Sequence, residues 1–254
     1  MRILIVGASG YIGSRLLALL VKQGHEVYAF CRRKPDLLIT KDLKSHVHFI
    51  RGDLLRISTL KVIPKSIDAA YYLVHSMKER ATGFLEDEAN SASNFKSVIE
   101  KTDCKQIIYL AGLAVGKKLS EHMQSRVNVE SILQKSVIPT TVLRAGIIIG
   151  SGSASFEIIR DLVEKLPIMI APKWVNNRCQ PIAIRDVLFY LTKVLSHKQC
   201  LGQVFEIGGP EKIRYKEMLL RFAKVRGLHR KIIQVPLLTP RLSSYWLFFI
   251  TSTP

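Results

Sequence analysis

The feature that most constrains the fold is a glycine-rich loop that directly follows a short apolar run. Residues 2–6 read Arg-Ile-Leu-Ile-Val, and residues 7–13 read Gly-Ala-Ser-Gly-Tyr-Ile-Gly. Between residues 11 and 23, apolar side chains recur at helical spacing, at Ile12, Leu16, Leu19 and Leu20. The pattern predicts a strand, a tight loop and an amphipathic helix.

The rest of the chain continues to alternate between strand and helix patterns. Further strands are predicted at 27–31, 48–50, 69–74 and 106–110 and from 141 onward, with helices at 84–101, 121–135 and 156–165. Strands that are apolar on both faces are typical of parallel sheets covered by helices. We therefore predict an α/β fold, a doubly wound parallel sheet of the Rossmann type. Residues 1–150 form its core, and residues 151–254 supply the last sheet strands and a small C-terminal substrate or interaction lobe.

The glycine loop favours binding of a dinucleotide. Backbone N–H groups at a helix N-terminus are unsatisfied, and the helix dipole adds positive potential, so a pyrophosphate docks there. Gly7 permits the turn, Gly10 allows the pyrophosphate to come close, and Gly13 lets the helix pack on the strand. The alternative is a tight turn with no ligand. The expected cofactor contacts of the loop are Gly7, Ser9, Gly10, Tyr11, Ile12 and Gly13.

The end of the second predicted strand bears on the choice of cofactor. An acidic residue there would hold the ribose hydroxyls, whereas an arginine accepts a 2′-phosphate. The sequence has Arg32, Arg33 and Lys34 at this point. A guanidinium pairs with phosphate through two hydrogen bonds, so we predict NADP(H) rather than NAD(H), with Arg32 as the main contact and Arg33 assisting. A solvated basic turn is the competing interpretation.

Two further strand ends supply candidate cofactor contacts. Asp53, followed by Leu54, comes directly after the third strand and suits hydrogen bonding to the adenine edge, although a simple turn aspartate is an alternative. Leu73, Val74 and His75 end the fourth strand. We expect His75 to face the nicotinamide, with a histidine bonded only to backbone as the competing interpretation.

Composition excludes several classes of function. The net charge of +18 invites a polyanion partner, but Lys and Arg are dispersed and no stacking-aromatic or zinc-finger motif accompanies them, which argues against nucleic acid. The four cysteines form no C-x-x-C pair, so we predict no metal site and a reducing, cytoplasmic location. The apolar run before the glycine loop is too short for the core of a signal peptide, so we expect no secretion signal. The apolar stretch at 245–250 is far shorter than the roughly 20 residues of a membrane span.

The motifs also resemble a known family. The G-x-x-G-x-x-G loop, together with Gly52-Asp53-Leu54, resembles the short-chain dehydrogenase/reductase superfamily, in particular its atypical, NmrA-like NAD(P)H-binding branch. Residues 73–77, 144–157 and 167–175 resemble a bacterial subgroup of that branch. Longer members of the subgroup continue into a helix-grip domain after the segment that corresponds to 236–241. We expect the aromatic segment 245–250 to pack on the chain's own core, and a protein partner or, as the resemblance implies, a missing C-terminal domain is the alternative.

The same resemblance locates a catalytic pair and shows that it is altered. Ordinary members use a Tyr-x-x-x-Lys pair and a strand-end serine, and the lysine lowers the pKa of the tyrosine. Here His122 and Arg126 stand at the tyrosine and lysine positions, and the strand ends in Ala111-Gly112. We therefore name His122 as a candidate proton relay with Arg126 beside it, and a solvated helix histidine as the alternative.

Two hypotheses of function remain open. The first is an NADP(H)-dependent oxidoreductase with an altered proton donor, acting on an unidentified carbonyl or quinone-like small molecule. The second is a non-catalytic NAD(P)H-binding redox sensor or an assembly or regulatory scaffold. Arg144 and the loop 150–155 are expected to hold the substrate, although an internal ion pair for Arg144 is an alternative.

Overall fold

The protein is described by a computed structural model that covers residues 1–33, 41–74, 83–113 and 119–235. The chain forms two compact units. The first comprises Met1–Ala145 and Arg185–Ile207, and the second comprises Gly146–Ile184 and Gly208–Pro254. The chain thus leaves the first unit after Ala145 and returns to it at Arg185.

The first unit is built on a seven-stranded parallel sheet with the order β11-β6-β5-β4-β1-β2-β3. The sequence order reverses at β1, which lies between β2 and β4. Its strands are β1 (Arg2–Val6), β2 (Glu26–Cys31), β3 (Val47–Arg51), β4 (Ala69–Tyr72), β5 (Ile107–Gly112), β6 (Thr140–Ala145) and β11 (Val204–Ile207). The predicted Rossmann-like α/β fold is confirmed.

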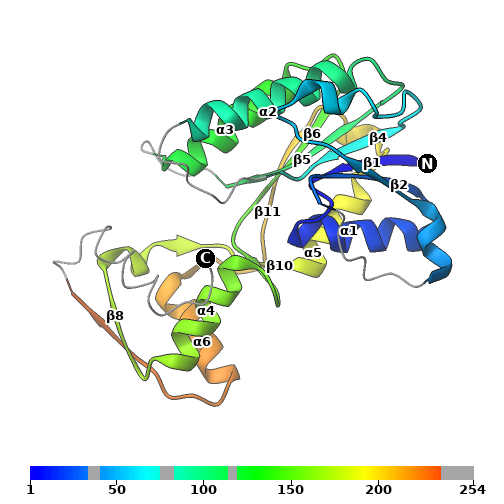
Figure 1. The fold of residues 1–254 in the computed structure, drawn as a ribbon. Coiled ribbons are helices and arrows are strands. Elements are labelled where there is room, and N and C mark those ends of the chain that lie inside the picture. Colours follow the sequence, from blue (N-terminus) through cyan, green and yellow to red (C-terminus); the bar gives the residue numbers. More distant parts are fainter. Residues whose placement is uncertain (34–40, 75–82, 114–118, 236–254) are drawn as a thin grey trace. The chain divides into compact units, whose positions relative to one another are not determined.

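Helices cover both faces of this sheet. They are α1 (Tyr11–Lys22), α2 (Phe84–Ile99), α3 (Glu121–Gln134) and α5 (Ile184–Lys193). Figure 1 shows α2 and α3 on one face and α1 and α5 on the other. Short 3₁₀ helices span Lys41–His46, Ile57–Leu60 and Lys198–Cys200. The periodicity places α1, α2 and α3 within a few residues of their observed ends.

The core of the first unit explains why its central strands are apolar throughout. Every residue of β4 and β5 is buried, as expected for parallel strands covered on both faces. Tyr72, Phe95 and Tyr109 form a cluster of tilted rings between β4, α2 and β5. The buried face of α2 includes the polar residues Glu88 and Ser91, whereas Leu85 and Ala89 are only partly buried.

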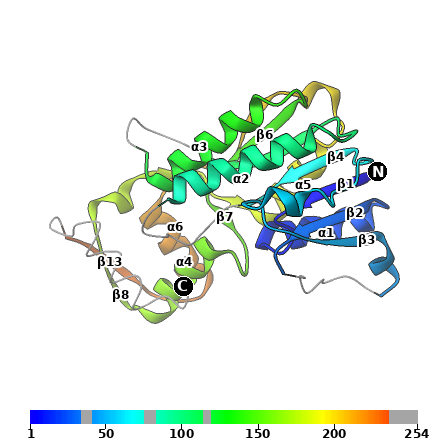
Figure 2. The ribbon, with the colours of Figure 1, turned by 45° about the horizontal axis from the view of Figure 1, so that its top comes forward.

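The second unit combines two helices with three two-stranded sheets, β10-β7, β12-β9 and β13-β8. Its elements are β7 (Ile148–Ile149), α4 (Ala154–Lys165), β8 (Ile168–Ala171), a 3₁₀ helix (Lys173–Asn176), β9 (Arg178–Cys179), β10 (Ile182–Ala183), β12 (Ile213–Arg214), α6 (Tyr215–Val225) and β13 (Lys231–Gln234). β13 pairs with β8 in parallel, and both views show α4 and α6 beside each other (Figures 1 and 2). Its core includes Val163, Met169, Met218 and Ala223.

Two sequence predictions can be compared with the described residues only in part. None of the described helices is long and apolar enough to cross a membrane. The aromatic stretch 245–250 lies outside the described residues, and so does His75. Neither α5 nor β11 is among the elements predicted from the sequence, although Val187, Leu188 and Leu191 of α5 recur at helical spacing.

Candidate cofactor-binding site

The loop between β1 and α1 has a backbone that requires glycine at its first position. Gly7 has a φ of +91°, in the left-handed region that favours glycine. A Cβ on this residue would lie 2.8 Å from the carbonyl oxygen of Leu73. The Gly7 N–H donates to the carbonyl oxygen of Phe30 at 3.1 Å, which ties the loop to the end of β2. Gly7 therefore lets the loop pack closely against the ends of both neighbouring strands.

The other two loop glycines differ from each other in the space around them. A Cβ on Gly13 would lie 2.2 Å from the carbonyl oxygen of Gly7, so the first turn of α1 lies directly on the loop. A Cβ on Gly10 would meet only the same oxygen, at 3.3 Å. Gly10 is the N-cap residue of α1, and no side chain caps the helix there. The N–H groups of the first turn are therefore available to an anion, as a pyrophosphate site requires.

The side chains around the loop are also defined. Ser9 is exposed, whereas Tyr11 and Ile12 are half-buried. The guanidinium of Arg15 lies 3.9 Å from the centre of the Tyr11 ring and donates to the Tyr11 carbonyl oxygen at 3.0 Å. The thiol of Cys31 lies next to Ser9 at the end of β2; burial raises its pKa to about 11 despite a hydrogen bond with Ser9.

Arg32 and Arg33 follow β2 directly and are exposed. β2 pairs with β1 in parallel, so the two arginines leave the sheet at the same edge as the glycine loop. Neither forms an ion pair with any residue that the structure describes. Their charge at the carboxyl end of β2 is what an anionic 2′-phosphate requires, while Lys34 lies outside the described residues.

The remaining predicted contacts lie at the ends of β3 and β4. The Oδ1 of Asp53 accepts a hydrogen bond from the Leu55 N–H at 3.1 Å, the arrangement of a turn aspartate, and its other carboxylate oxygen has no partner among the described residues. The Leu54 side chain belongs to the hydrophobic core. The Leu73 N–H donates to the Val6 carbonyl oxygen at 2.9 Å. Val74 packs against the same core. Because the Leu54 side chain is buried in this core, any contact of Leu54 with the cofactor involves its backbone.

The helix that carries the altered catalytic pair is held to the sheet at two points. The Tyr109 hydroxyl on β5 donates to the carbonyl oxygen of Arg126 at 3.3 Å. One turn later, Glu130 accepts hydrogen bonds from Arg144 on β6, at 3.1 Å from Nε and 2.6 Å from Nη2. The internal ion pair considered for Arg144 is therefore present. Its guanidinium is engaged by Glu130, which leaves it poorly placed to hold a substrate.

His122 and Arg126 lie differently around the end of β5. The His122 ring makes an edge contact with Phe84 at the start of α2, with 4.9 Å between ring centroids. The Arg126 side chain instead reaches over the strand end, and its Nη1 lies 2.5 Å from where a Cβ of Gly112 would be. The structure thus places both residues at the carboxyl edge of the sheet, the edge at which the glycine loop also lies.

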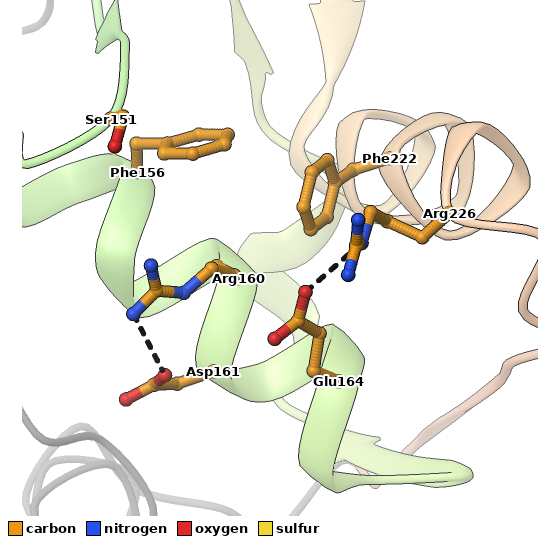
Figure 3. Close-up of a pocket in the computed structure, with 7 residues that line it drawn as sticks. All are labelled: Ser151, Phe156, Arg160, Asp161, Glu164, Phe222 and Arg226. Atoms are coloured by element: carbon orange, nitrogen blue, oxygen red, sulfur yellow. Dashed lines mark ion pairs between the residues drawn. The ribbon is translucent and has the colours of Figure 1, made fainter.

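A separate pocket lies in the second unit, between α4 and α6 (Figure 3). Its volume is about 460 Å³, and it is lined by Ser151, Phe156, Arg160, Asp161, Glu164, Phe222 and Arg226. Figure 3 shows the two arginines turned toward carboxylates: Arg160 lies 3.8 Å from Asp161, and Arg226 lies 3.0 Å from Glu164. Sequence reasoning missed this pocket, since pairing between two helices distant in sequence leaves no local signal. Among the described residues no group of His, Cys, Asp and Glu could hold a metal ion.

The N-terminal half of the chain has a known family pattern. Residues 3–126 match the model of the NAD dependent epimerase/dehydratase family. The match covers just under half of the chain and makes residues 3–126 similar to that family. It includes the glycine loop, the end of β2 and the His122–Arg126 pair, so the residues that form the candidate site all lie within the matched region, apart from the substrate contacts expected after it. The narrower likeness to NmrA-like proteins remains a resemblance.

Known proteins extend the similarity beyond the matched segment. Divinyl chlorophyllide a 8-vinyl-reductase of Arabidopsis thaliana is 24% identical over 255 residues, which cover 92% of this chain and 60% of that protein. The chain therefore spans about three-fifths of the length of this relative.

Solved structures support the fold of nearly the whole chain. Epimerase Mth375 from Methanothermobacter thermautotrophicus has a TM-score of 0.76 at 13% identity, covering 92% of this chain and 80% of its own. A point mutant of UDP-glucuronic acid 4-epimerase from Bacillus cereus, solved with NAD and a fluorinated UDP-glucuronic acid, has a TM-score of 0.71 at 20% identity. It covers 96% of this chain and 92% of its own. At these identities the likeness establishes the fold.

Proposed function

We propose that this protein is an NADP(H)-dependent oxidoreductase that acts on a carbonyl or quinone-like small molecule. The observation that carries the proposal is the geometry of the glycine loop. Gly7 is left-handed and packed against Leu73, Gly13 has no room for a Cβ, and Gly10 is the N-cap residue of α1, where no side chain caps the helix. A loop that needed only to turn would have no reason to keep the helix N-terminus uncapped and accessible.

Different residues of the chain bind different parts of the cofactor. The N–H groups of residues 11–13 and the exposed Ser9 bind the pyrophosphate. Arg32, assisted by Arg33, binds the 2′-phosphate and favours NADP(H) over NAD(H). The second carboxylate oxygen of Asp53 accepts from the adenine edge while the first holds the Leu55 N–H.

When bound, the dinucleotide would supply or accept the hydride. His122 then delivers the proton that balances hydride addition to a carbonyl carbon, passing it to the carbonyl oxygen. A protonated imidazole can give up a ring proton to a carbonyl oxygen, which suits His122 to this role. The edge contact with Phe84 fixes the orientation of the ring.

Similar proteins support a redox function of this kind. The Arabidopsis relative is named a reductase, and the B. cereus epimerase mutant was solved with bound NAD. Because the chain spans only part of the Arabidopsis protein, that protein's own substrate is a separate candidate to test.

A specific observation also favours the second candidate function, a non-catalytic NAD(P)H sensor or scaffold. The strand end that carries serine in ordinary short-chain dehydrogenases is Gly112, whose Cβ space is taken by Arg126. The tyrosine position is His122, packed against Phe84. A protein that only reports the dinucleotide would need the glycine loop and no proton donor.

The decisive experiment is calorimetric titration of the purified chain with NADPH and NADH. We expect NADPH to bind more tightly, Arg32→Ala to remove that preference, and Gly10→Val to abolish binding. Arg185→Ala is the matched control, because the Arg185 side chain is 88% exposed on α5 and is none of the residues assigned to the site. Equal binding of both dinucleotides by the unmodified chain would contradict the NADP(H) assignment, and binding of neither would contradict the whole proposal.

Oxidation of NADPH, followed by its absorbance, separates the two candidate functions. The chain is tested on a panel of quinones, aldehydes and ketones, and on divinyl chlorophyllide a. Turnover that His122→Asn slows at least about tenfold, without weaker NADPH binding, supports the oxidoreductase. Tight NADPH binding with no turnover on any of these compounds supports the sensor.

A further inference from the structure

Arg126 differs in its surroundings from the other partly buried arginines of the described chain. Arg144 and Arg160 lie beside carboxylates, and Arg15 and Arg230 donate to backbone carbonyl oxygens. Arg126 is half-buried, yet its guanidinium makes neither an ion pair nor a hydrogen bond with any residue the structure describes. A cation that is partly removed from water without an anionic partner is costly. Such a group is suited to binding an anion.

The position of this guanidinium depends on the absence of a side chain at the end of β5. Its Nη1 lies 2.5 Å from where a Cβ of Gly112 would stand, a distance that no real Cβ contact allows. Gly112 and Arg126 are thus matched: the glycine provides the space that the arginine fills. Any other residue at 112 would push the guanidinium away from the strand end.

The backbone that carries Arg126 is fixed rather than loosely attached. Its own carbonyl oxygen accepts from the Tyr109 hydroxyl, and the Ser120 hydroxyl caps the start of α3 by accepting from the Met123 N–H at 3.3 Å. Glu130, one turn further along, is held by Arg144. Fixing the helix on both sides of Arg126 lowers the entropy lost when the guanidinium binds a ligand.

The immediate neighbour of the guanidinium is apolar. The Sδ and Cε atoms of Met123 lie 3.3 Å from the same Cβ position of Gly112 that Arg126 approaches. The cationic side chain also lowers the pKa of Tyr109, although burial of that phenol has the larger, opposite effect, and Glu88 and Glu130 also raise it. A cation beside a thioether fits an anionic group attached to an apolar body.

We propose that Arg126 binds a carboxylate of the substrate at the end of β5, and that Gly112 makes this site possible. The inference rests on the proposed function and adds to it the substrate class: a carbonyl or quinone-like compound that carries a carboxylate. The planar guanidinium offers two parallel N–H groups to the two carboxylate oxygens. It positions the substrate and takes no part in proton transfer.

The test uses the full chain and a defined probe, 4-(trifluoromethyl)benzoate, observed by fluorine NMR because this method detects millimolar binding. The neutral 4-(trifluoromethyl)benzamide and the phosphonate of the same ring are compared with it. Each titration is run with and without saturating NADPH. We expect the benzoate to bind in both conditions, the benzamide to bind at least about tenfold more weakly, and the phosphonate not to exceed the benzoate.

Three variants connect this binding to the geometry. Arg126→Met and Gly112→Ala should each weaken benzoate binding at least about tenfold, the second while the arginine is still present. Gly112→Ala should fold, because the atom it displaces is the far end of a flexible side chain. Arg185→Met, at a position whose side chain is 88% exposed, is the control and should bind as the unmodified chain does.

Several outcomes would overturn the proposal. Benzoate binding that is absent, or is unchanged in Arg126→Met, shows that the guanidinium does not hold a carboxylate. Binding that disappears when NADPH is added shows that the arginine belongs to the cofactor site, and tighter binding of the phosphonate shows a phosphate site. Failure of NADPH to bind contradicts the proposed function alone, because the titrations without NADPH still decide the role of Arg126.

Discussion

Glu130 on α3 and Arg144 on β6 form a two-point ion pair, with Nε and Nη2 of the arginine donating to the two carboxylate oxygens at 3.1 and 2.6 Å. The glutamate side chain is 8% exposed, whereas the arginine side chain is 36% exposed. Hydrogen bonding to Glu130 raises the pKa of Arg144. The pair joins the helix that carries His122 and Arg126 to the sheet.

The unequal burial predicts unequal costs when each partner is removed. Arg144→Met leaves a buried carboxylate without its cation and should lower the free energy of unfolding by about 2–3 kcal/mol. Glu130→Gln leaves an arginine that can turn to solvent and should cost about 1–2 kcal/mol. Urea denaturation of both variants and of the double variant measures this. A larger loss of unfolding free energy in Glu130→Gln than in Arg144→Met would contradict this prediction.

The loop glycines should respond differently to the same small substitution. Gly13→Ala places a methyl group 2.2 Å from a backbone oxygen and should destabilise the fold by about 2 kcal/mol. Gly10→Ala has the extended backbone of an N-cap residue and should cost less than about 1 kcal/mol. Its methyl group nevertheless enters the space of the pyrophosphate, so NADPH binding should weaken at least about tenfold. Thermal unfolding and calorimetry on the two variants separate these effects.

The acid sensitivity of the first unit should include a contribution from Glu100 at the end of α2. Burial alone would raise the pKa of Glu100, but hydrogen bonds from Ser136, the Val137 N–H and Lys96 together hold it below the ordinary value of 4.5. A lowered folded pKa stabilises the protein above the unfolded pKa, and this stabilisation is lost as the pH falls through the folded one. Glu100→Gln should therefore cost about 1 kcal/mol at pH 7 and little below pH ~4.

Urea titrations of the Glu100→Gln variant and the unmodified chain between pH 3 and 7 test this dependence. The difference in unfolding free energy should shrink steadily toward acid. A difference that is constant over the whole range would mean that the hydrogen bonds hold the side chain regardless of its charge.

The buried cysteines should resist alkylation. Burial raises the pKa of both Cys31 and Cys104 to about 11, so only about one thiol in a thousand is ionised at pH 8. Cys200 is only partly buried and should react first with iodoacetamide. Peptide mapping by mass spectrometry over a time course gives the order. Rapid labelling of Cys31 would show that the end of β2 opens in solution.

The parts of the structure that local pattern determines were predictable. Apolar runs and glycines locate β1, the loop and α1, because a strand buried on both faces and a helix opening on Gly10 both leave signals within a dozen or so residues. The burial of a charged residue on α2 was not predictable in this way. Glu88 is buried near Tyr72 and Tyr109, on two different strands, and no spacing within residues 84–99 indicates such neighbours.

Contacts between distant segments account for what the sequence left open. The choice between a substrate contact and an ion pair for Arg144 depends on which turn of α3 faces β6, and the structure favours Glu130. The close approach of the Arg126 guanidinium to Gly112 likewise depends on how α3 packs on β5, which the sequence alone does not give. The assignment of cofactor and catalytic residues stays a prediction until the titrations are done.

β11 is the last strand of the central sheet in sequence order, so the sheet is incomplete until this strand has been synthesised. Residues 204–207 pair with β6, so a fragment cut at residue 150 would leave β6 with an unpaired row of N–H and C=O groups. During synthesis the same edge stays open until residue 207 has left the ribosome. Expression of the N-terminal half alone is therefore expected to yield aggregates, and a soluble minimal protein must extend at least through β11.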